Sequence, residues 1–136
     1  ALVSLNLMSF DNALDAISAL WKVVPHYTPH PIYSAGILKT IRYIHEHYKE
    51  NIALPDFAQS LNITANYYAV LFRQITSFSF SEFLISIRMY HAARLLKETN
   101  LSIASIAESC GFSDAAYFSH YFKKIYRQTP RGYRKS

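Results

Sequence analysis

The stretch SIASIAESCGFSDAAYFSHYFKKIYRQTP, residues 102–130, decides the fold of this chain. Apolar residues recur at helical spacing in its first third, and Gly111 then interrupts the pattern. Glycine adopts the left-handed backbone of a tight turn without steric cost. Ser113 or Asp114 can then cap a second helix. The stretch therefore predicts two short helices joined by a tight turn, which is the pattern of a helix-turn-helix.

The second of these helices has two unlike faces. We expect its aromatic residues to point inward, and these are Tyr117, Phe118, Tyr121 and Phe122. The other face carries small, polar and basic residues, namely Ala115, Ala116, Ser119, His120 and Lys123. Such a face is typical of a helix that enters a DNA groove. Taken alone, the same pattern also fits an ordinary helical hairpin.

An earlier stretch, ALPDFAQSLNITANYYAVLFRQI at residues 53–75, repeats the pattern. A small residue recurs where two helices must cross closely, and a residue that tolerates left-handed backbone follows it. The matched pairs are Ala58 with Ala107, Asn62 with Gly111, Tyr68 with Phe118, Phe72 with Phe122, and Arg73 with Lys123. The offset changes from 49 to 50 after the turn, so the second copy has one additional residue there. This internal repeat predicts two helix-turn-helix units.

Between the two copies, residues 81–97 predict one long helix. About 17 residues at 1.5 Å each span roughly 25 Å. That length approaches the ~34 Å between successive major-groove faces of B-DNA. One chain could therefore hold two recognition helices in adjacent grooves.

The first 34 residues are expected to form a separate segment. Residues 1–24 predict an extra N-terminal helix, and the prolines of residues 25–31 predict an extended linker. This helix either serves as a connecting or dimerisation helix or packs on the domain that follows. We accordingly divide the chain into an N-terminal helix with its linker, residues 1–34, and a double helix-turn-helix domain, residues 35–136.

Composition favours binding to a polyanion over catalysis. The formal net charge is +5, and no acidic residue follows Asp114, whereas six Lys or Arg do. The sequence has no catalytic constellation or phosphate-binding loop, so we expect no enzymatic activity, cofactor or metal site. The single cysteine, Cys110, fits a core position in a reducing compartment. The absence of a long apolar run predicts no membrane span.

Two stretches of the sequence resemble a known protein family. IASIAESCGFSDAAYFSHYFKKIYRQTPRGYR, residues 103–134, and SFSFSEFLISIRMYHAARLL, residues 77–96, resemble the DNA-binding domain of the AraC/XylS family of bacterial transcriptional regulators. The resemblance implies an all-α fold of about seven helices, with two helix-turn-helix units whose recognition helices enter successive major grooves of promoter DNA. It also implies a cytoplasmic protein that works with RNA polymerase. A homodimer through upstream residues and the nature of an upstream domain stay open.

Several positions depart from the family pattern. Ser77 and Arg127 stand where the family usually has glycine, and Val70 stands where arginine is frequent. Alanine and valine can contact a thymine methyl but cannot form a bidentate bond to guanine. We therefore expect DNA shape and phosphate contacts to contribute much of the binding.

The resemblance and the helix spacing together nominate the DNA-contacting residues. The candidates for base reading are Asn66, Ala69, Val70, Ala115, Ala116, Ser119 and His120. The candidates for phosphate contact are Thr64, Arg73, Ser102, Lys123, Lys124, Arg127 and Arg131. We expect Tyr67, Tyr68, Tyr117 and Tyr121 to belong to the core. The alternative to specific DNA binding is a helical module for non-specific nucleic-acid binding or for protein interaction.

Overall fold

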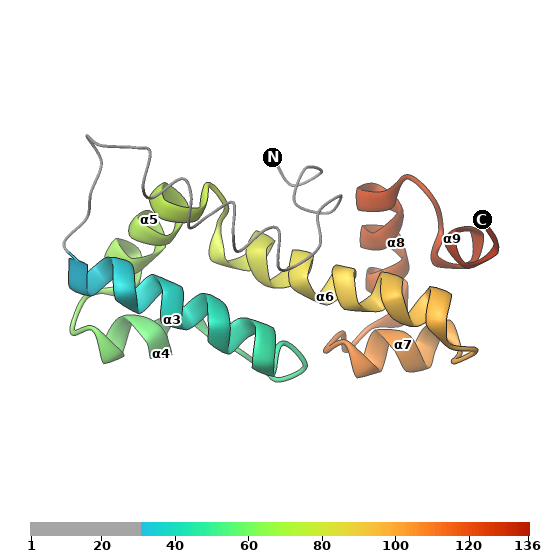
Figure 1. The fold of residues 1–136 in the computed structure, drawn as a ribbon, viewed down its shortest axis with the longest axis horizontal. Coiled ribbons are helices and arrows are strands. Elements are labelled where there is room, and N and C mark those ends of the chain that lie inside the picture. The colour runs from blue at the N-terminus through green and yellow to red at the C-terminus, as the bar shows by residue number, and fades with distance from the viewer. Residues whose placement is uncertain (1–30) are drawn as a thin grey trace.

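The computed structural model describes residues 31–136, and every regular element in that range is a helix (Figure 1). The helices are α3 (Pro31–His47), α4 (Leu54–Ser60), α5 (Ala65–Thr76), α6 (Phe80–Glu98), α7 (Ile103–Ser109), α8 (Ala115–Tyr126) and α9 (Pro130–Lys135). The prediction of an all-α fold with two units joined by a long helix is confirmed. The predicted N-terminal helix and most of the predicted linker lie outside the described residues.

The first helix of the domain begins earlier than the sequence pattern indicated. The domain is predicted to begin at residue 35, whereas its first helix, α3, begins at Pro31. Proline is tolerated in the first turn of a helix because its missing N–H would have no intrahelical partner there. The last proline of the expected linker therefore belongs to the helix.

The turn of the first unit has the expected left-handed residue. Asn62 lies between α4 and α5 with φ of 57°. The N–H of Ile63 donates to the carbonyl of Ala58 at 3.2 Å, which closes the turn. Ala58 is buried where the two helices cross. Thr64 then caps α5 and accepts a hydrogen bond from the Tyr67 N–H.

The second unit repeats this turn with one additional residue. Gly111 has φ of 92°, and the Phe112 N–H donates to the carbonyl of Ala107 at 2.9 Å. The additional residue lies between Phe112 and the cap of α8. That cap is Asp114, whose carboxylate accepts hydrogen bonds from the first turn of the helix. Of the two predicted caps, the structure therefore selects the aspartate.

Helix α6 contributes to two hydrophobic cores. Its first half buries Phe80, Phe83, Leu84 and Ile87 with the residues of α3, α4 and α5. Its second half buries Met89, Ala92, Ala93 and Leu96 with those of α7 and α8. Figure 1 shows the two units at opposite ends of this helix. The relative position of the units therefore depends on α6 and on the contacts that the two units make with each other next to this helix.

The closing residues pack back on the second unit. The Tyr133 ring contacts the rings of Phe122 and Tyr126, and the Arg134 Nε donates to the Leu96 carbonyl at 3.0 Å. Cys110 is fully buried in the same core, and this burial raises the pKa of its thiol to about 11. The cysteine is therefore a packing residue, as predicted.

Candidate nucleic-acid interface

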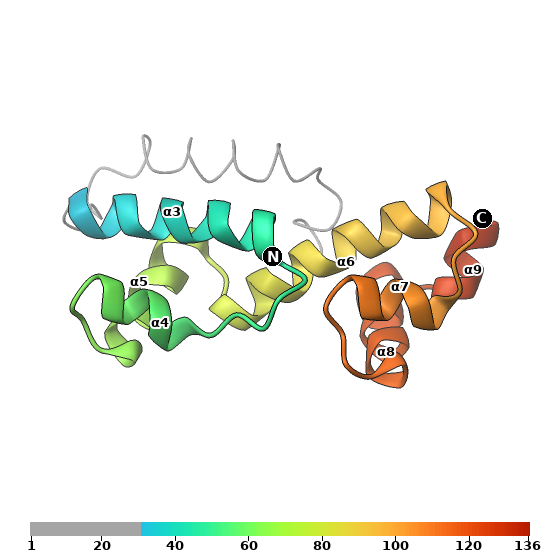
Figure 2. The ribbon, with the colours of Figure 1, turned by 90° about the horizontal axis from the view of Figure 1, so that it is seen from below.

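The two predicted recognition helices, α5 and α8, hold equivalent places in their units. Each contains 12 residues, and each follows a seven-residue helix across a turn with left-handed backbone. In Figure 2 both helix pairs, α4 with α5 and α7 with α8, lie on the same side of α3 and α6, below them in this view. This arrangement places the outer faces of two similar helices on one molecule without a second chain.

The predicted base-reading residues lie on the outer faces of these helices. On α5, Asn66 and Ala69 are exposed, and the Val70 side chain is 50% exposed. On α8 the exposed members are Ala115, Ala116 and His120, while Ser119 is half-buried. The structure thus brings each set together on one helix face. It leaves Ser119 less accessible than the other three members on α8.

Two tyrosines that the sequence assigned to the core lie at the surface. Tyr67 and Tyr117 are 46% and 47% exposed, so their assignment to the core was wrong. Each is the third residue of its recognition helix, at the edge of the apolar face, where a phenol can pack its ring and keep its hydroxyl in water. By contrast, Tyr68 is fully buried, so its assignment to the core is confirmed. Tyr121 is half-buried, so its assignment is confirmed only in part.

The repeat offers a signal that could have found this pair. Tyr67 and Tyr117 are related by the offset of 50 that follows the turn. A polar-tipped residue recurring at the third position of both recognition helices is more consistent with a common surface role than with packing. Tyr67 and Tyr117 are therefore further candidates for the interface.

Two of the phosphate candidates begin helices. The hydroxyl of Thr64 accepts from the Tyr67 N–H at 3.1 Å, and the hydroxyl of Ser102 accepts from the Ser105 N–H at 3.0 Å. Both residues are exposed. The equivalent of Ser102 in the first unit is Ala53, which has no side-chain cap. The two units therefore differ at this point of their surfaces.

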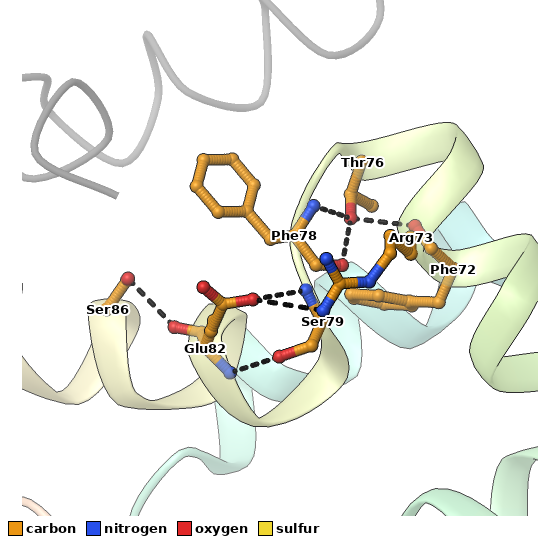
Figure 3. A network of polar contacts seen from close by, with 7 residues as sticks. All are labelled: Phe72, Arg73, Thr76, Phe78, Ser79, Glu82 and Ser86. Atoms are coloured by element: carbon orange, nitrogen blue, oxygen red, sulfur yellow. Dashed lines mark hydrogen bonds and ion pairs between the residues drawn. The ribbon is translucent and has the colours of Figure 1, made fainter. Parts of the chain in front are cut away.

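Arg73 lies in a polar network that joins α5 to α6 (Figure 3). Its Nη2 is 3.6 Å from the Oε1 of Glu82. The same carboxylate accepts a hydrogen bond from the Ser79 N–H at 2.9 Å, which lowers the pKa of Glu82 below its usual value. Arg73 thus has one acidic neighbour, and its exposed guanidinium is partly neutralised where α5 ends.

The corresponding end of α8 is more basic. Lys123, Lys124 and Arg127 are exposed, and the ammonium of Lys124 lies over the Tyr121 ring at 5.6 Å from its centroid. Arg131, also exposed, follows on α9. No acidic side chain pairs with any of these four cations within residues 31–136. The positive charge of these four side chains gives the second unit the stronger attraction for an anion.

Two other site classes find no support in the part of the chain that the structure describes. Within residues 31–136, no three His, Cys, Asp or Glu side chains are grouped so that they could hold a metal ion. None of the described helices is long and apolar enough to cross a membrane.

The domain that carries these two units is similar to known proteins in sequence and in fold. The helix-turn-helix domain family matches residues 57–136. The Msm operon regulatory protein of Streptococcus mutans is 37% identical over 92 residues, which are 68% of this chain and 33% of that protein. The chain thus spans about a third of the length of the curated relatives it matches.

Solved structures share the arrangement of helices. The C-terminal domain of AraT, a response regulator from Geobacillus stearothermophilus, is 35% identical with a TM-score of 0.67, covering 77% of this chain and 84% of that domain. The DNA-binding domain of the global transcriptional factor AdpA, solved in complex with a target DNA, has a TM-score of 0.69 at 23% identity. That match covers 74% of this chain and 90% of the AdpA domain, and it shows a common fold.

Proposed function

Because this chain belongs to the AraC/XylS family of transcriptional regulators and carries that family's helix-turn-helix DNA-binding domain, we propose that α5 and α8 enter successive major grooves of promoter DNA. The observation that carries this proposal is the equivalence of the two helices. The two helices lie on the same side of α3 and α6, near opposite ends of the 19-residue helix α6. A helix of that length spans about 28 Å, close to the ~34 Å repeat of B-DNA.

The two units divide the work of recognition unequally. In α8, His120 and Ser119 supply hydrogen-bonding groups for base edges, and Ala115 and Ala116 allow close approach to the groove. In α5, Asn66 is the polar member, while Ala69 and Val70 offer only apolar contact. We infer that α8 reads more of the sequence and that α5 contributes shape and thymine-methyl contacts.

Phosphate contacts set the register of both helices on the duplex. We assign them to the cations at the helix ends and to the caps, which are Thr64, Arg73, Ser102, Lys123, Lys124, Arg127 and Arg131. The phenol groups of Tyr67 and Tyr117 join this set, since an exposed hydroxyl near a helix N-terminus can donate to a phosphate oxygen. Arg73 has an acidic neighbour, whereas Lys123 has none within residues 31–136, so Lys123 is expected to contribute more.

Membership of the family also suggests a protein partner and a cellular location. We propose RNA polymerase as the protein partner of the promoter-bound chain and the bacterial cytoplasm as its location. A homodimer, which the sequence leaves open, would form through residues upstream of the domain.

The test is a selection from randomised duplexes of ~25 base pairs at physiological salt, a length that accommodates two major-groove faces. We expect an enriched motif with two half-sites about one helical turn apart. Enrichment of a single half-site would restrict sequence reading to one unit. No enrichment, with binding that disappears as salt rises, would leave the alternative of non-specific nucleic-acid binding.

A further inference from the structure

Arg88 lies at the boundary between the two hydrophobic cores. Its neighbour Ile87 is buried in the core of the first unit, and its other neighbour, Met89, is buried in the core of the second. The Arg88 side chain is half-buried, although it is charged. A buried guanidinium needs hydrogen-bond acceptors to offset the loss of its hydration, so its partners identify what it holds together.

Two of these partners belong to the first unit. The Nε of Arg88 donates to the carbonyl of Tyr48 at 2.7 Å, and its Nη2 donates to the carbonyl of Glu50 at 2.8 Å. Both carbonyls follow the end of α3 at His47. Carbonyls beyond the last helical turn have no intrahelical partner, and charge-assisted bonds to them are stronger than neutral ones. Arg88 thereby fixes the loop after α3 to the middle of α6.

The second unit touches the same guanidinium. A Cβ added to Gly111 would lie 3.0 Å from the Arg88 Nε and 3.0 Å from the Tyr48 carbonyl oxygen. The ring of Phe112 lies with its centroid 5.9 Å from the Arg88 Cζ. The turn of the second helix-turn-helix therefore packs directly against the place where Arg88 holds the first unit.

Tyr48 adds a second connection at this junction. Its ring stacks in parallel on the ring of His91, with centroids 4.0 Å apart. Tyr48 also packs against both hydrophobic cores. The loop after α3 is thus joined to α6 at two points, by the Tyr48 carbonyl at Arg88 and by the Tyr48 ring at His91.

We propose that Arg88 is a positioning residue that fixes the relative orientation of α5 and α8, and with it the separation of half-sites that the protein accepts. This inference rests on the proposed function. Two units joined by one helix can change their relative angle when that helix bends. A contact that lies beside the helix axis and touches both units opposes this bending, and Arg88 makes such a contact.

The first experiment measures orientation without DNA. Spin labels are placed on Gln59→Cys and Glu108→Cys, two exposed positions that the repeat relates, while native Cys110 stays buried. We expect Arg88→Ala to broaden the distance distribution between the labels, and Arg88→Lys to broaden it less, because a lysine ammonium can keep only part of the paired contact. Arg94→Ala, which removes an exposed arginine of the same helix, is the control.

The second experiment measures spacing preference. Duplexes carry the two half-sites found by selection, with the distance between them varied base pair by base pair. We expect the affinity advantage of the preferred spacing to fall about fivefold or more in Arg88→Ala, within the usual range for coupling between two sites. Affinity for a single half-site should stay unchanged, whereas a general loss of folding would lower it.

The outcomes separate the two ideas. An unchanged distance distribution in Arg88→Ala would overturn the positioning role whatever the DNA results are. A broadened distribution with no sequence-specific binding in the wild type would keep the positioning role and reject the proposed function. If Arg88→Ala does not fold, Arg88→Lys is read by the same criteria.

Discussion

Ser77 and Arg127 occupy equivalent positions fifty residues apart, and both have left-handed backbone, with φ of 68° and 64°. Each ends a recognition helix, and its N–H donates at 2.8 Å to the carbonyl four residues before it. The family resemblance places glycine at both positions. The two departures therefore keep the shape of the turn and put an L-residue where its Cβ is unfavourable.

Ser77→Gly should stabilise the domain. Relief of left-handed strain, roughly 1–2 kcal/mol, exceeds the entropy that glycine loses on folding, roughly 0.5–1 kcal/mol, so we expect a net gain of about 0.5–1 kcal/mol. Urea unfolding measures this change in free energy. Ser77 is not among the proposed DNA contacts, so its variant should bind DNA as before.

The matched variant Arg127→Gly should stabilise by a similar amount and bind DNA more weakly, because it also removes a phosphate candidate. Gln128→Gly is the control, since Gln128 is exposed and its φ is not positive. A gain in stability for Gln128→Gly equal to that of Arg127→Gly would show that backbone strain is not the cause.

Lys123→Ala should weaken binding to every DNA sequence alike. One phosphate contact fewer reduces the slope of log affinity against log salt by about 0.9. A salt titration of binding to the selected operator and to an unrelated duplex measures this slope. Lys39→Ala, which changes an exposed lysine on α3, should leave the slope as it is. An unchanged slope for Lys123→Ala would make this lysine an ordinary solvated side chain.

His120→Ala should relax specificity instead of lowering all affinities. If the imidazole reads a base edge, its loss costs about 1–3 kcal/mol at one or two base pairs and nothing elsewhere. A selection from randomised duplexes with wild type and variant side by side reports this difference. Identical preferences in the two selections would remove His120 from the base-reading set.

The repeat made most of the fold predictable. The pairing of Ala58 with Ala107 and of Asn62 with Gly111 located both turns, and the structure has each alanine buried and each turn residue left-handed. These features depend on local backbone and on close helix crossing, which a single residue type reveals. The all-α arrangement followed from them.

Contacts between distant residues were not predictable in the same way. Tyr117 was placed in the core because it neighbours Phe118 in an aromatic run, yet only one of two adjacent residues can point directly inward on a helix. The bonds from Arg88 join residues that are 38 and 40 positions apart and end on backbone carbonyls. Every residue has such a carbonyl, so the sequence carries no mark of which one is chosen.

His91 should make the stability of the domain fall in mild acid. Burial, and then the neighbouring His45, lowers the pKa of the His91 imidazole to about 4, from an ordinary value of 6.5. Above pH ~6.5 the ring is neutral in both folded and unfolded chains and contributes nothing. Below that pH the imidazole is protonated in the unfolded chain, whereas in the folded chain it stays neutral until about pH 4. The free energy of unfolding therefore falls as pH falls through this window.

Urea unfolding at intervals from pH ~7.5 to ~5 stays above the range in which carboxylates titrate and measures this effect. We expect a decline of about 1 kcal/mol between pH ~6.5 and ~5, reduced from the full linkage value because the ring is half-exposed. His91→Gln should be less stable at neutral pH, since it loses the stack on Tyr48, but should lack most of the decline. His120→Gln, a change at an exposed histidine, should keep it. Equal pH slopes in wild type and His91→Gln would mean that another group refuses the proton.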